Sequence, residues 1–177
     1  MRLVRTALLL AAATLAGCAT RQPGPPEAYP PTTYPARPQT GAISPATYVA
    51  QAASIDLFVV RSSELAQLRS VDPRLRNVAN SLRAGHEGLA SQLSFAGRRL
   101  DLLPGATMLP QHQAMLDELS ASSDFDHTYL RLQRAVHGAA LALHADYARR
   151  GSSPTLRPVA ANAAAVERSH LELLRGL

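Results

Sequence analysis

The sequence predicts an all-α protein: an antiparallel four-helix bundle with a short extra helix in the connection between its second and third long helices. Apolar residues recur at helical spacing in four long segments, and no segment alternates apolar and polar residues for long enough to form a strand. A proline directly after a serine or an aspartate opens three of these segments, at Ser44-Pro45, Asp72-Pro73 and Ser153-Pro154. The connections at about 71–72 and 151–153 are short, which favours antiparallel neighbours.

Each predicted helix has its own start or stop signal. The helices are expected at residues 45–70, 73–101, 110–121, 124–150 and 154–177, the third being the short one. The loop "LLPGATML" precedes Pro110, which opens the short helix. Ser123 is placed to cap the next helix, and Gly151 ends it. We therefore expect residues 46–177 to form one helical domain, large enough to bury its own core.

Residues 1–17 have the pattern of a secretory signal peptide. Arg2 and Arg5 precede the apolar run "ALLLAAATLA", which is too short to span a bilayer, and "LAG" precedes Cys18. The stretch "LAGC" resembles a bacterial lipobox, in which the cysteine becomes the acylated N-terminus. We expect Cys18, the only cysteine, to carry the lipid and to anchor the chain to a membrane. With Ala19 after it, the expected location in a Gram-negative host is the outer membrane, facing the periplasm.

Residues 18–45 are expected to form a tether between the lipid and the domain. Eight of the 13 prolines lie between Arg21 and Pro45, and this stretch has no periodic apolar pattern. As an extended polyproline segment it could reach roughly 75 Å. The formal charge of the chain is +5, but the domain itself has neither a basic tract nor interleaved aromatic residues. These observations argue against binding to nucleic acid.

Titratable residues lie within the apolar stripe of every long helix. The candidate site residues are Asp56, His86, His137, Glu167 and His170. At 1.5 Å per residue, all five fall about 18 to 25 Å from the end of the bundle that holds the two short connections. The sequence therefore predicts that they form one layer. His144 is predicted to fall outside it, because it lies about 10.5 Å along the helix from His137, too far for the two to share one ion.

Two interpretations of this layer stay open. Three imidazoles with one or two carboxylates suit Zn, Fe or Mn, and Glu167 with His170 has the Glu-x-x-His spacing of bundle carboxylate proteins. Alternatively, the histidines are structural and are satisfied by hydrogen bonds to one another and to the acids. The chain has no Ser-His-Asp arrangement, Gly-rich phosphate loop or CxxC motif, which leaves little support for an ordinary hydrolase or nucleotide enzyme.

Several segments resemble a ferritin-like family of the bacterial envelope, domain of unknown function 4142. They are "LFVVRSSELAQL", "DPRLRNVANSLRAGHEGL", "HQAMLDELSASSDFDHTYLRLQRAVHGAALALHADYARRG" and "VERSHLELL", and the similarity covers residues 47–175. The most specific part is the pattern formed by Phe125, Asp126, Tyr129, Leu130 and His137. The resemblance implies a ferritin-like fold and an envelope location, but no activity.

The family's characteristic histidines correspond to His86, His137 and His170. Two oxygen ligands that members often have correspond here to Val59 and Gly85, which cannot bind a metal through a side chain. Asp56 lies one helical turn before Val59 and is the candidate to compensate.

Three functional hypotheses follow. The favoured one is a non-catalytic envelope lipoprotein whose bundle binds a partner, such as another envelope protein, and helps the cell to survive stress. The second is binding or storage of Zn, Fe or Mn by the predicted layer. The third is a redox enzyme of the ferritin-like kind; because the duplicated Glu-x-x-His motif of such enzymes is absent, an enzymatic role is less favoured.

Overall fold

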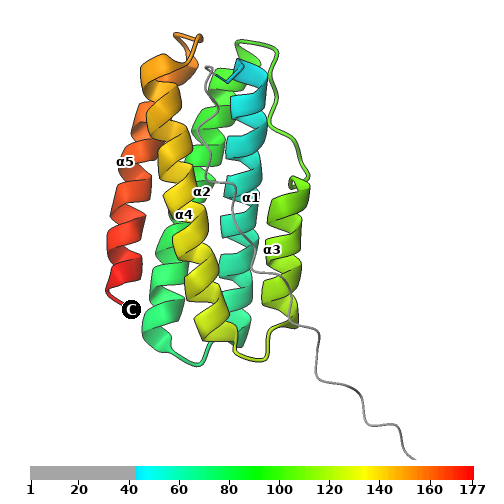
Figure 1. Cartoon of the computed structure of the whole chain (residues 1–177), viewed down its shortest axis with the longest axis vertical. Coiled ribbons are helices and arrows are strands. Elements are labelled where there is room, and N and C mark those ends of the chain that lie inside the picture. Colours follow the sequence, from blue (N-terminus) through cyan, green and yellow to red (C-terminus); the bar gives the residue numbers. More distant parts are fainter. Residues whose placement is uncertain (1–42) are drawn as a thin grey trace, which may run out of the picture. The chain divides into compact units, whose positions relative to one another are not determined.

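The structure, a computed structural model, describes residues 43–177 (Figure 1). Within this range it consists of α1 (Pro45–Arg69), α2 (Pro73–Arg98), α3 (Pro110–Ala121), α4 (Phe125–Arg150) and α5 (Leu156–Arg175), with no strand. The predicted all-α class is thus confirmed for the described part of the chain. The predicted signal peptide, Cys18 and all but the last residues of the tether lie outside the described residues.

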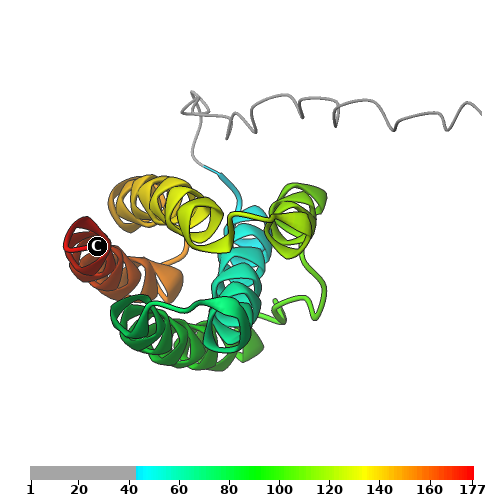
Figure 2. The same cartoon turned by 90° about the horizontal axis from the view of Figure 1, so that it is seen from below.

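The four long helices pack in the order α1–α2–α5–α4, and α4 returns to contact α1. Seen along the helix axes, they surround a common interior, and α3 lies outside them against α1 and α4 (Figure 2). The chain reverses direction between α1 and α2 and again between α4 and α5 (Figure 1). Every long helix therefore has one face directed to the same interior.

Of the five described helices, only α1 and α2 begin with a side-chain capping hydrogen bond. Ser44 Oγ accepts a hydrogen bond from the Thr47 amide at 3.1 Å, and Asp72 Oδ1 accepts one from the Arg74 amide at 2.8 Å. The prediction that Ser123 caps α4 is wrong, because the cap residue is the next one along the chain and its side chain makes no capping bond. The last helix begins at Leu156 rather than at residue 154, where the chain still forms a turn.

The helix α2 ends three residues earlier than predicted. The amide of Leu102 turns back to donate to the carbonyl oxygen of Gly97 at 3.0 Å, and Asp101 adopts a φ of 54°. A Cβ at position 97 would lie 2.2 Å from the Leu102 oxygen, so this turn requires glycine there. Helical periodicity continued past Arg98 in the sequence, but this close backbone approach ends the helix.

The interior contains two apolar clusters. The larger one contains residues of all five helices and includes Phe58, Leu82 and Tyr129. The smaller one contains Tyr48 and Tyr147, whose stacked rings have centroids 4.0 Å apart. On α2 and α5, the buried His and Glu residues lie between the stretches that supply the two clusters, whereas Asp56 and His137 lie within stretches of the larger cluster. A polar layer thus interrupts the core, although apolar side chains there would contribute about 1.5 to 3 kcal/mol each.

None of the helices in residues 43–177 combines the length and the apolar character needed to cross a bilayer.

Candidate metal centre

Four buried side chains from three helices meet in the polar layer. They are His86 on α2, His137 on α4, and Glu167 and His170 on α5, and each offers one potential ligand atom within 4.8 Å of the others. We call this group the histidine–glutamate cluster. His86, His137 and Glu167 are 0% exposed and His170 is 6% exposed. The structure therefore brings four of the five predicted site residues together.

The fifth candidate, Asp56 on α1, lies behind His86. Its Oδ1 atom is 2.8 Å from His86 Nδ1, and it is not one of the four residues in the cluster. A carboxyl group on the far nitrogen of an imidazole fixes the orientation of the ring and its tautomer, and the carboxylate form also raises the basicity of the other nitrogen. The geometry thus gives Asp56 an orienting position rather than a ligating one.

The ring of His137 is fixed in a similar way by the backbone. Its Nδ1 atom lies 2.8 Å from the carbonyl oxygen of Gln133, which can only accept a hydrogen bond. Nδ1 must therefore carry the proton, and in the neutral ring Nε2 has a free lone pair. This Nε2 atom faces Nε2 of His86 at 3.3 Å.

The protonation of Asp56 decides what lies between these two nitrogens. When Asp56 is protonated, its hydroxyl donates to His86 Nδ1, and His86 Nε2–H then donates to His137 Nε2. When Asp56 is ionised it accepts from His86 Nδ1–H, and two lone pairs then face each other at 3.3 Å. The second arrangement is repulsive unless a cation lies nearby. The site therefore has one arrangement suited to the absence of a cation and another suited to its presence.

Glu167 has no hydrogen-bond partner at either carboxyl oxygen. Oε1 is 3.7 Å from His86 Nε2, and Oε2 is 3.9 Å from His137 Nε2, both beyond hydrogen-bonding distance. Two donors at about 2.1 Å from one ion in a tetrahedral site are separated by roughly 3.4 Å. The separations around Glu167 are thus too long for direct hydrogen bonds but close to those of ligands that share an ion.

Burial controls the charge of every member of the layer. It lowers the pKa of His86 to about 3 and that of His170 to about 4, and it holds the pKa of His137 well below the usual value. It also raises the pKa of Glu167 and of Asp56 well above their usual values, and for Glu167 the nearby Asp56 adds to the shift. The imidazoles are therefore neutral at pH 7, the form that ligates metals, whereas the acids favour their neutral form until a cation is present.

His144, predicted to lie outside the layer, is not one of the four cluster residues, but its side chain comes close to them. Its Nε2 atom lies 3.9 Å from Glu167 Oε1 and has no hydrogen-bond partner, while Nδ1 is 3.0 Å from the hydroxyl of Tyr48. The prediction measured backbone heights, but long side chains extend several ångströms along the axis. A cavity of about 10 Å³, close to the space of one water molecule, is lined by Tyr48, Asp56 and His144, among others.

His112 is a buried residue to which the sequence analysis gave no role. It lies on α3, and its Nδ1 atom is 2.6 Å from Ser54 Oγ on α1. Ser54 Oγ also accepts a hydrogen bond from the Leu109 amide at 2.7 Å, so this polar contact fixes α3 to α1. The signal that could have found it is the spacing of His112 with Met115 and Leu119, which places all three on one helix face.

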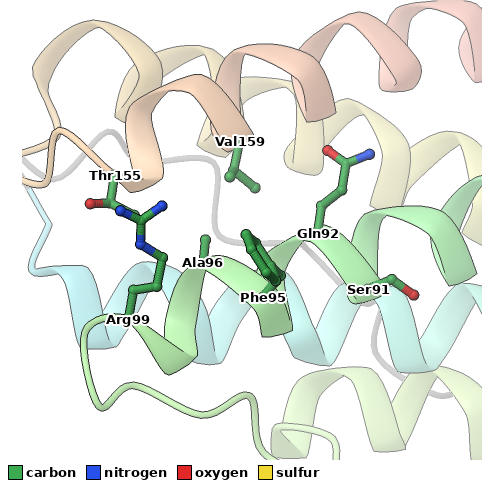
Figure 3. Close-up of a pocket in the computed structure, with 7 residues that line it drawn as sticks. All are labelled: Ser91, Gln92, Phe95, Ala96, Arg99, Thr155 and Val159. Atoms are coloured by element: carbon green, nitrogen blue, oxygen red, sulfur yellow. The ribbon is translucent and has the colours of Figure 1, made fainter.

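A second hollow lies apart from these residues. It is a groove of about 440 Å³ between α2 and α5, shown in Figure 3. Phe95 and Val159 face it from the two helices, and Arg99 extends toward Thr155 across one end. None of the four cluster residues lines this groove, so its walls offer no imidazole or carboxylate to a metal.

The fold is similar to those of three solved structures. CopM in the Cu(II)-bound form matches with a TM-score of 0.65 at 13% identity, over 76% of this chain and 95% of CopM. CopM in the Cu(I)-bound form matches with a TM-score of 0.63 at 11% identity, over 76% and 94%. A crystal structure of a DUF305 fragment from Deinococcus radiodurans matches with a TM-score of 0.65 at 17% identity, over 76% and 96%. At these identities the likeness concerns the fold alone.

No curated protein matches the chain in sequence. One family model does match it, over residues 30–177, a range that includes all five helices and every residue of the polar layer. This match agrees with the resemblance that the sequence motifs indicated, and the chain therefore belongs to the family described as "Domain of unknown function (DUF4142)".

Proposed function

We propose that the helices form a ferritin-like antiparallel four-helix bundle, with α3 as the extra helix, and that this bundle binds one divalent transition-metal ion in the histidine–glutamate cluster. The observation that carries the proposal is Glu167, a fully buried acid without a hydrogen bond, next to the facing Nε2 atoms of His86 and His137. Leaving a buried polar group without a partner costs a folded protein about 1 to 3 kcal/mol. A metal ion would give this group its partner.

Charge balance favours a single divalent ion. The three imidazoles of the cluster are neutral, and Glu167 and Asp56 carry one negative charge each when ionised. One divalent ion then makes the buried site neutral overall. A second divalent ion would leave two uncompensated positive charges in the core, where an unpaired charge is very costly.

The ligand set suggests which metals to test first. Three imidazoles and a carboxylate, with no sulfur ligand, suit Cu(II) and Zn(II) as well as Fe or Mn, and Cu(II) binds most tightly to a given set of such ligands. CopM, whose fold this chain resembles, has been solved in Cu(II)-bound and Cu(I)-bound forms. We therefore propose copper as the first metal to test, with Zn, Fe and Mn as alternatives.

We further propose that the domain binds or stores its metal without catalysis, at the membrane of the cell envelope. Four protein ligands fill the coordination of a tetrahedral ion, which is typical of a closed site rather than a catalytic one. In this proposal Cys18 carries the lipid, the Pro-rich segment is the tether, and in a Gram-negative host the domain faces the periplasm from the outer membrane. An envelope protein that exchanges metal with the domain is the proposed partner.

Metal analysis of the chain with Cys18→Ser, purified without chelator and loaded with Cu(II) or Zn(II), tests the proposed function. We expect one ion per chain and a melting temperature that rises with metal. The variant His137→Ala should lose this ion, whereas the control His127→Ala, which removes an exposed histidine, should keep it. Substoichiometric metal together with an unchanged melting temperature would contradict the proposal.

A further inference from the structure

A glycine on α2 makes the space that His170 occupies. A Cβ built on Gly85 would lie 2.5 Å from both Cε1 and Nε2 of the His170 ring, closer than real Cβ contacts allow. The next atom, Cγ1 of Val166, is at an ordinary contact distance of 3.7 Å. The edge of the imidazole ring thus packs directly against the backbone of α2.

Neither the α2 backbone nor the His170 ring can easily move away from this contact. On α2, the neighbouring Leu82 and His86 are 0% exposed and hold the helix in the core. The rings of His86 and His137 also lie next to the His170 ring, each with its centroid 5.3 Å away. The position of the His170 ring therefore depends on the missing side chain at residue 85.

Glycine has a cost at this position, because in the middle of a helix it is less favourable than alanine. A second glycine of α2, Gly88, lies one turn further along, and a Cβ there would meet nothing within 4 Å. The two glycines thus share a helix and an intrinsic cost, but only one of them faces a cluster residue. This makes Gly88 a matched control for Gly85.

We propose that Gly85 is a positioning residue of the metal centre, whose lack of a side chain lets His170 reach the ion together with His86 and His137. This inference rests on the proposed function and adds to it a residue that is not itself a ligand. An alanine at position 85 pushes the ring of His170 out of place while it leaves all four ligands in the chain.

The test compares Gly85→Ala with Gly88→Ala in the chain that carries Cys18→Ser, each loaded with Cu(II) or Co(II). Gly88→Ala should bind with the affinity and visible spectrum of the parent. Gly85→Ala should bind more than tenfold more weakly and with an altered spectrum, because one ligand is displaced. A parent that binds no metal overturns the proposed function and this role with it. A parent that binds metal, with both alanine variants unchanged, overturns only the role of Gly85.

A metal-free measurement tests the contact itself and covers the case in which Gly85→Ala folds poorly. In the parent, Gly88→Ala should raise the melting temperature and Gly85→Ala should lower it. With His170→Ala as background, the ring is absent, so Gly85→Ala should now raise the melting temperature as Gly88→Ala does. If Gly85→Ala lowers the melting temperature equally in both backgrounds, the added methyl group contacts something other than His170, and the inference is wrong.

Discussion

The Nε2 atoms of His86 and His137 lie 3.3 Å apart in the core, where both side chains are 0% exposed. Because the backbone carbonyl of Gln133 accepts a hydrogen bond from His137 Nδ1, only His86 can supply a proton between the two rings when both are neutral. The two rings therefore share either a proton or a cation, and the protonation state of Asp56 determines which of the two it is.

Glu167→Gln should separate metal binding from folding. The amide has the shape of the neutral acid that burial favours in the metal-free protein, so the free energy of unfolding should change by less than about 1 kcal/mol. Metal affinity should fall by about a hundredfold or more, because the site loses a ligand and a negative charge. Denaturant unfolding and competition titration measure the two effects, and an unchanged affinity would exclude Glu167 as a ligand.

Asp56→Asn should weaken metal binding without removing a ligand. The amide oxygen can still accept from His86 Nδ1–H, but the charge that balances the ion is gone. Loss of such an outer partner typically costs about 10- to 100-fold in metal affinity. Calorimetric titration of the parent and the variant measures this loss. Complete loss of the ion would instead place Asp56 among the ligands.

The metal-free protein should lose stability as the solution becomes mildly acidic. The pKa values of His86 and His170 are lowered by burial to about 3 and about 4, whereas in the unfolded chain both take the usual value of 6.5. Stability from these groups is thus complete above pH 6.5 and decreases as the pH falls toward 4, by up to about 1.4 kcal/mol per pH unit for each histidine. The raised pKa values of Asp56 and Glu167 oppose this loss, but the buried histidines with lowered pKa values outnumber these two acids, so a net loss is expected. Urea unfolding at pH 7, 6 and 5 checks this, and a flat profile would contradict it.

Metal binding should release protons. Burial raises the pKa values of Asp56 and Glu167 well above their usual range, and an ion requires both acids in the ionised form. Affinity should therefore rise with pH until these acids are already ionised in the metal-free protein. Titration calorimetry in two buffers with different ionisation enthalpies counts the protons, and identical heats would show that none is released.

The histidines should ligate through different ring nitrogens. His86 and His137 have Nδ1 engaged with Asp56 and with a backbone carbonyl, so we expect each to bind through Nε2. His170 has a buried Nδ1 without a partner, and its Nε2 edge packs on Gly85, so we expect binding through Nδ1. Long-range ¹H–¹⁵N spectra of the Zn(II)-loaded protein distinguish the two nitrogens of each ring. The same nitrogen in all three rings would refute this assignment.

The sequence predicted the helices well because their signals are local. The short helix was predicted at residues 110–121, where the structure has it, since Pro110 marks its start. The end of α2 was missed, because it depends on the approach of the Leu102 amide to Gly97, a contact made by the folded loop. Apolar periodicity says which face a residue occupies but not where a loop returns.

The candidate site was predictable only to the accuracy of backbone heights. Counting residues placed His86 and His137 at one level, and their rings indeed meet. The same counting put His144 elsewhere, because it ignores the reach of the side chain toward Glu167. The orienting position of Asp56 could not be predicted either, since a helical stripe does not identify a hydrogen-bond partner on another helix.

The histidine–glutamate cluster joins α2 to the consecutive helices α4 and α5. A chain with a single cysteine cannot form an internal disulfide, so no disulfide can link its helices. An ion at this level would act as a reversible substitute, tying three segments together for as long as it is held. Release of the metal would remove this link between the helices. The free energy of unfolding of the protein would then depend on the metal concentration around it.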